Sequence, residues 1–253
     1  MRKLSSPIRF FLLLVFVISF LQTGLFAQTR LLPDPGPTLA GRFGRVPAPG
    51  VHPRVLFGPD ELVRMRLQVK STEVGKFTIG RVEQFLGVIH TPGKQLAETY
   101  AGLLKGDVNA TTSVKDPFWQ NKITLALMLE SYDALLREDQ AKGQQAGAAL
   151  ATIALIPRNW ASNESDILFF SLAYDFDYGY MSEAQRRAVR QAIATGTANR
   201  KTYGADFPAD WQNYNWVPRG MNLVISALAI EGEQGYDASI YAPSLQVMKN
   251  FLH

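Results

Sequence analysis

The segment Tyr174–Tyr178 (Y-D-F-D-Y) combines two carboxylates with two tyrosines, side chains that can serve acid–base chemistry. A glycoside hydrolase needs two carboxylates that face one cleft. Asp175 and Asp177 are two residues apart, and residues at that spacing lie on different faces of a helix. We therefore expect one carboxylate to face the core and the other to bond a neighbouring helix. Hydrolysis with Asp175 as a catalytic carboxylate stays open as an alternative.

A second polar and aromatic stretch, W-Q-N-Y-N-W-V-P-R, runs from Trp211 to Arg219. Asparagines in a loop commonly bond the backbone and cap the helix that follows, which is the plain interpretation of Asn213 and Asn215. Trp211 and Trp216 have an equally plain interpretation as core residues. On the residues alone, Arg219 is a solvated residue at a helix start.

Other site chemistries are excluded by composition. The chain has no cysteine, so thiol catalysis and cysteine metal sites are ruled out, and its three histidines are too scattered to predict a zinc site. His52 precedes a proline at the edge of a linker, so we expect a surface or docking residue. We expect no cofactor and no metal.

The first 27 residues predict a secretory signal peptide. Arg2, Lys3 and Arg9 precede an apolar run at 10–21, and a small-residue cleavage site ends at Ala27. The run is too short for the roughly 20 residues of a membrane span, so we expect no stable anchor. The segment holds three of the 26 basic residues and none of the 22 acidic residues, so the remainder is nearly neutral. That balance gives no support for nucleic-acid binding. A periplasmic or secreted location follows.

Residues 28–53 are rich in proline and glycine and predict a linker, extended on the domain surface or partly disordered. The residues from 54 to 253 show helical periodicity and no convincing strand pattern. Ser182 and Gln185 form a capping box at the start of one helix. The expected helices begin at Pro59 and continue at 73–89, 94–105, 117–136, 139–156, 164–179, 182–193, 217–231 and from 243 onward.

These helices predict an all-α fold. The pattern of successive antiparallel helices with short loops is typical of an (α/α) toroid or a helical-hairpin array. The last helix is still running at His253, which leads us to expect an incomplete toroid in a truncated chain.

Three segments, taken in order, resemble a known family. They are HPRVLFGPDELVRMR at 52–66, LAYDFDYGYMSEAQRRAVRQAI at 172–193 and WQNYNWVPRGMNLVISALAI at 211–230. This set is similar to the N-terminal α/α-toroid domain of heparinase II/III-like polysaccharide lyases and related alginate lyases. The resemblance covers most of the chain behind the signal peptide.

The resemblance implies β-elimination on a uronic-acid polysaccharide. A side chain neutralises the uronate carboxylate and so acidifies the C5 proton, which a tyrosine or histidine removes. Asn215, or Asn213 in a shifted register, matches the neutralising position. The resemblance further implies aromatic residues that stack on sugar rings, a role that we assign to Trp211, Tyr214, Trp216 and Tyr174. Arg219 is then expected to bind an acidic group of the substrate.

The chain departs from the family pattern after the asparagine pair, where Trp216 replaces a histidine. The remaining catalytic residues of the family come from later helices and a β-sandwich domain, so we expect this chain to supply one wall of the cleft and to be inactive alone. Two alternatives stay open: an α/α-toroid glycoside hydrolase, and a non-catalytic glycan-binding module. The sequence identifies neither the polymer nor its linkage.

Overall fold

The structure, a computed structural model, describes residues 47–112, 114, 119–156, 164–198 and 216–242. These ranges contain eight α-helices and no β-strand, which confirms the all-α prediction. The helices are α3 (Pro59–Ser71), α4 (Glu73–Ile89), α5 (Gln95–Leu104), α6 (Trp119–Arg137), α7 (Gln140–Leu155), α8 (Glu164–Asp177), α9 (Glu183–Ala198) and α10 (Trp216–Ala229), followed by the 3-10 turn η3 (Ala238–Ile240). The helix expected from Pro243 lies outside the described residues, and closure into a toroid stays a prediction.

The helix ends follow from local chemistry. Pro59 opens α3 with Asp60 and Glu61 in its first turn, where carboxylates favour the positive end of the helix dipole. Ser182 and Gln185 form the predicted capping box of α9, since each backbone N–H is bonded by the other residue's side chain. These caps explain why the sequence located the helix starts well.

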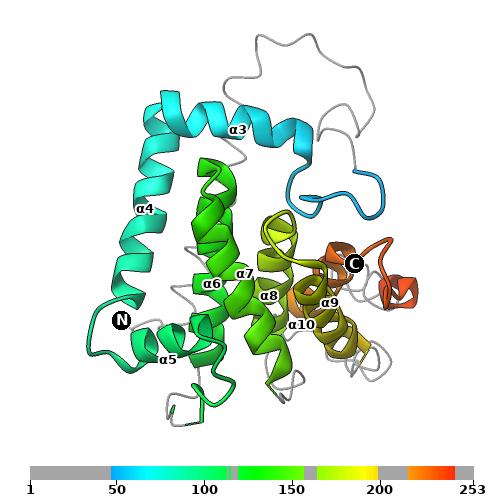
Figure 1. Ribbon diagram of the computed structural model, residues 1–253. Coiled ribbons are helices and arrows are strands. Elements are labelled where there is room, and N and C mark those ends of the chain that lie inside the picture. The colour runs from blue at the N-terminus through cyan, green and yellow to red at the C-terminus, as the bar shows by residue number, and fades with distance from the viewer. Residues whose placement is uncertain (1–46, 113, 115–118, 157–163, 199–215, 243–253) are drawn as a thin grey trace, which may run out of the picture. The chain divides into compact units, whose positions relative to one another are not determined.

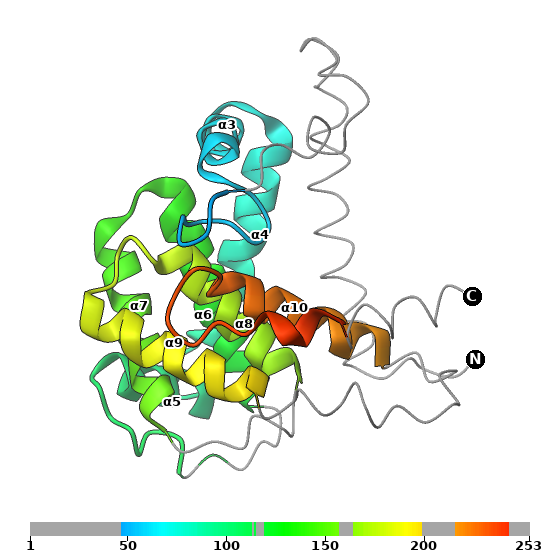
Figure 2. The same cartoon turned by 90° about the vertical axis from the view of Figure 1, so that its right-hand side faces the viewer.

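Helices α6 and α8 form the centre of the described helices and pack most extensively against each other (Figure 1). Every side chain of α8 from Phe169 to Asp177 is buried, because α6, α7, α9 and α10 all contact it. Figure 2 shows α9 and α10 beside α8. A helix surrounded in this way must satisfy every polar side chain that it carries.

The hairpin of α6 and α7 has a two-residue link. Glu138 adopts a left-handed backbone conformation, with φ of 61°, and ends α6. The next residue, Asp139, caps α7 by accepting a bond from the backbone N–H of Lys142 at 3.0 Å. This short link makes the two helices neighbours, as their spacing in the sequence predicted.

The described residues from 47 onward belong to one compact unit. Residues 47–53, which we assigned to the linker, therefore belong with the helical unit. Gly50 donates its backbone N–H to the carbonyl of Glu231 at 2.8 Å, just beyond α10. We call residues 47–55 the strap, because this segment fastens onto α8 and the turn after α10.

None of the helices described is both long enough and apolar enough to cross a lipid bilayer.

Candidate functional site

Most of the site predicted from the sequence falls where side chains are not described. Four of its members lie outside the described residues: Trp211, Asn213, Tyr214 and Asn215. Trp216 and Arg219 belong to the first turns of α10, where only the backbone is described. Their roles stay predictions, and Tyr174 alone can be examined in place.

Tyr174 lies in the interior of the protein, with an exposed fraction of 0%. Its hydroxyl donates to the carboxylate of Glu233, with oxygen–oxygen distances of 2.9 and 2.7 Å. Burial, reinforced by this bond, raises the pKa of Tyr174 far above that of an ordinary phenol. A ring that is covered on all sides cannot stack on a sugar, so the predicted substrate contact does not fit its position. Tyr174 instead positions Glu233.

The carboxylate of Asp175 binds the backbone of the strap. It accepts bonds from the backbone N–H of Arg54, at 3.0 Å to each oxygen, and from that of Val55, at 3.0 Å. A third donor is the imidazole of His52, whose Nδ1 lies 2.7 Å from Oδ1. Asp175 is buried and its lone pairs are used, so it cannot act as the acid or base of a hydrolase. The alternative that relied on Asp175 is not supported by this position.

His52 bridges two carboxylates. Its Nδ1 faces Asp175 and its Nε2 lies 3.2 Å from Oε1 of Glu233, while its ring stacks on Tyr178 with centroids 4.0 Å apart. Burial by itself lowers the pKa of His52, but the bonds to both carboxylates outweigh it and raise that pKa. The imidazole therefore favours the doubly protonated cation, which donates on both sides. The sequence predicted either a surface residue or a docking residue at position 52. The side chain of His52 is only 2% exposed, so the surface prediction was wrong, and His52 instead docks the strap onto α8.

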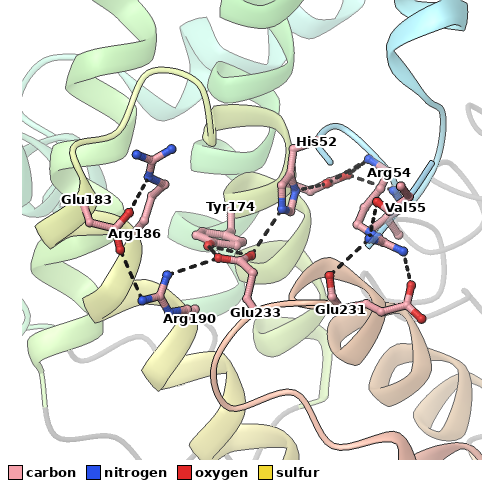
Figure 3. A network of polar contacts seen from close by, with 11 residues as sticks. His52, Arg54, Val55, Tyr174, Glu183, Arg186, Arg190, Glu231 and Glu233 are labelled. Atoms are coloured by element: carbon pink, nitrogen blue, oxygen red, sulfur yellow. Dashed lines mark hydrogen bonds and ion pairs between the residues drawn. The ribbon is translucent and has the colours of Figure 1, made fainter. Parts of the chain in front are cut away.

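Glu233 is the common acceptor of this cluster, which Figure 3 shows (Figure 3). Besides Tyr174 and His52, it accepts a bond from Arg190 of α9 at 3.3 Å. Burial would raise the pKa of Glu233, but these three donors lower it overall. The carboxylate is therefore held in its ionised form and joins the strap, α8 and α9.

A second ion pair fastens the strap. The guanidinium of Arg54 pairs with the carboxylate of Glu231 and donates to the backbone carbonyls of Ala48, at 3.1 Å, and of Glu231, at 3.2 Å. Like His52, the Arg54 side chain is 2% exposed. We call the group formed by His52, Arg54, Tyr174, Asp175, Arg190, Glu231 and Glu233 the strap cluster.

The strap cluster is chemically balanced. The cations His52, Arg54 and Arg190 offset three carboxylates, so little net charge is buried. Each carboxylate accepts several donors, which is what makes buried charge tolerable. Its nucleophiles and bases are already engaged, so the cluster acts as a fastening. The cluster offers no free group for substrate chemistry, and the segment before α10 stays the candidate that the sequence predicts.

The acids of this cluster were not predicted from the sequence. Glu231 and Glu233 follow the apolar stretch of α10 directly, in A-L-A-I-E-G-E. Two carboxylates at the end of a buried helix signal that a cation must lie close by. The partners, His52 and Arg54, are separated from them by most of the chain, and only the fold brings them together.

Among the residues described, no group of three or more histidine and acidic side chains is placed to hold a metal ion. Comparison with protein-family models, with curated proteins and with solved structures finds no match to this chain. The functional proposal therefore depends on the residues and their placement.

Proposed function

We propose that this chain is part of an exported, polysaccharide lyase-like protein that acts on a uronic-acid glycan by β-elimination. In this proposal the helices belong to an (α/α) toroid, and the chain supplies one wall of the substrate cleft. Asn215 neutralises the uronate carboxylate, with Asn213 as the alternative.

One observation supports the proposal most directly: the three segments that carry the family resemblance converge on α8. The first segment reaches Asp175 of the second through bonds from His52, Arg54 and Val55. The third segment contains α10, which packs on α8, and Ser226 Oγ lies 3.3 Å from the carbonyl oxygen of Ile167. Segments far apart in the sequence thus form one structural unit.

The chemistry proposed for the segment before α10 requires a hydrogen-bond donor that is held in a fixed position. An amide that donates to a uronate carboxylate lowers the cost of placing a carbanion at the adjacent C5. Such a donor works only when it is held in place. Because α10 packs against both α8 and α9, the loop that carries Asn215 leads into a helix that neighbouring helices fix on two sides.

The first prediction concerns Asn215. We expect the complete gene product to cleave one or more uronate polymers, such as alginate or heparan sulfate, and Asn215→Ala to lower kcat/KM at least 100-fold, the loss typical of one preorganised donor, about 2.7–4 kcal/mol. The measurement is ultraviolet absorbance, since elimination leaves a double bond conjugated to the carboxylate. The matched control is Asn109→Ala, at an exposed loop asparagine, which should keep full activity.

The outcomes separate the alternatives. New reducing ends without the ultraviolet chromophore would mean hydrolysis and would exclude a lyase. Binding of a uronate polymer by gel retardation, without cleavage, would favour the non-catalytic glycan-binding module. Unchanged turnover in folded Asn215→Ala, as checked by circular dichroism, would remove Asn215 from the site.

A further inference from the structure

Asp177 ends α8 and faces away from the strap cluster, as its spacing from Asp175 predicted. Its carboxyl group lies against α7: a methyl group added at Gly147 would come within 2.6 Å of Asp177 Oδ2. Glycine at position 147 is thus what allows α7 to approach the end of α8. The side chain of Asp177 is fully buried, with an exposed fraction of 0%.

Both carboxyl oxygens of Asp177 lack a hydrogen-bond partner in the structure as described. Asp175 offers the contrast, because it is equally buried but accepts bonds from two backbone N–H groups and an imidazole. An ionised carboxylate buried without donors is very costly, so such a group keeps its proton instead. Asp177 is therefore a neutral carboxylic acid in the folded protein.

Glu130 of α6 increases the preference of Asp177 for its protonated form. Glu130 accepts a bond from the Tyr100 hydroxyl and one from His90, whose Nε2 lies 2.5 Å from Oε1. The carboxylate of Glu130 lies close enough to Asp177 to repel a negative charge there. Burial first, and the charge of Glu130 second, raise the pKa of Asp177 to about 8.

In the part of the chain that the structure describes, no cation bonds the carboxyl group of Asp177. The α7 segment 143–150 contains no charged residue. Tyr180, in the turn after α8, donates its hydroxyl to the carbonyl of Ala134. On α3, the guanidinium of Arg66 is bound to the carbonyl of Leu135 and to Glu138.

We propose that Asp177 is a proton-operated latch between α7 and α8. With its proton bound, the carboxylic acid packs against Gly147 and the two helices lie close together. Loss of the proton in weakly alkaline solution leaves an uncompensated negative charge between α6, α7 and α8, and the contact loosens. The latch is independent of the proposed lyase activity.

The test compares the stability of the whole chain and of Asp177→Asn between pH 6 and pH 9 by urea unfolding. Because the folded state binds a proton that the unfolded state has released, the unfolding equilibrium constant of the native protein should rise about 100-fold over this range. Asp177→Asn carries a neutral side chain of the same shape and should lose most of that rise. Asp107→Asn, at an exposed loop residue, should keep it.

A second measurement does not depend on the variant folding. In the native protein, the carboxyl carbon of Asp177 should show an NMR titration midpoint near pH 8, and Glu130→Gln should lower that midpoint by removing the neighbouring charge. A carboxyl that titrates below pH 5, or pH curves that run parallel in the native protein and Asp177→Asn, would overturn the latch.

Discussion

At the scale of the residue, two aspartates on one helix show how the surroundings decide the chemistry of a side chain. Asp175 meets backbone N–H groups and an imidazole, so its oxygens accept bonds that join the strap to α8. Asp177 meets a glycine and no donor, so it keeps its proton. Because Asp175 and Asp177 are two residues apart, the sequence predicted that they lie on different faces of the helix. Nothing in the neighbouring sequence, however, indicates which hydrogen-bond donors either carboxyl group meets.

His52 gives the clearest prediction at this scale. His52→Ala leaves Asp175 and Glu233 without their shared cation, and removal of one partner from a buried ionic group typically costs about 3–5 kcal/mol. Because the pKa of His52 is raised, this cost should be complete below the ordinary pKa of about 6.5 and should shrink as the pH rises through the folded-state pKa. Urea unfolding at pH 5.5 and pH 9 measures the change.

His90→Ala is the matched control for His52→Ala, because His90 bonds one carboxylate and its side chain is 37% exposed. We expect a cost of at most about 1 kcal/mol there, as solvent screens the charge. Equal losses in the two variants, or a His52→Ala loss that does not vary with pH, would mean that the ionic role of His52 is misassigned.

At the scale of the element, small residues in α7 set how closely its neighbours approach. A methyl group at Gly143 would collide with the ring of Tyr180, whose hydroxyl bonds the carbonyl of Ala134 at 3.1 Å. Glycine at position 143 is therefore what lets the ring of Tyr180 lie against α7.

Gly143→Ala should therefore destabilise the protein by about 1–3 kcal/mol through overpacking. Gly80→Ala is the matched change in α4, since that position is exposed and nothing lies within 4 Å of the added methyl group. It should stabilise the protein by about 0.5–1 kcal/mol through helix propensity alone. Thermal unfolding of both variants checks the contrast, and a destabilising effect at both positions would contradict it.

The sequence predicted the helices and their starts better than any other feature of the structure. Helix starts at Pro59 and Ser182 have local causes, a proline in the first turn and a capping box, and both were predicted correctly. The strap cluster could not be predicted in the same way. Its contacts join Glu231 and Glu233 to His52 and Arg54, and no local pattern records a pairing between such distant positions.

At the scale of the whole molecule, the strap makes the residues just before α3 part of the helical unit, which begins at Val46. Arg54 alone joins both sides of this attachment, because its backbone N–H bonds Asp175 on α8 and its guanidinium bonds the carbonyl of Glu231 after α10. The boundary predicted after residue 53 stays a prediction, and the structure adds that residues 47–53 contact the helical unit.

Truncation tests this boundary. A chain that begins at Val46 should melt within about 2 °C of one that begins at residue 28, because it keeps the whole strap. A chain that begins at Pro59 lacks His52 and Arg54, and should melt about 10 °C lower or more, because buried carboxylates lose their partners. Differential scanning calorimetry measures the three midpoints, and identical melting of the two shorter chains would show that the strap contributes nothing.

The bond between His52 and Glu233 joins residues 181 positions apart. Since synthesis delivers the N-terminal end first, His52 emerges long before the carboxylate that it bridges to exists. The helices between them must therefore assemble around an unfastened strap, and closing so long a loop costs only slightly more than closing a shorter one. Delivery of residue 233 is thus the event that completes the attachment of the strap, and a chain interrupted before it would keep Tyr174 without its acceptor and the strap only half attached.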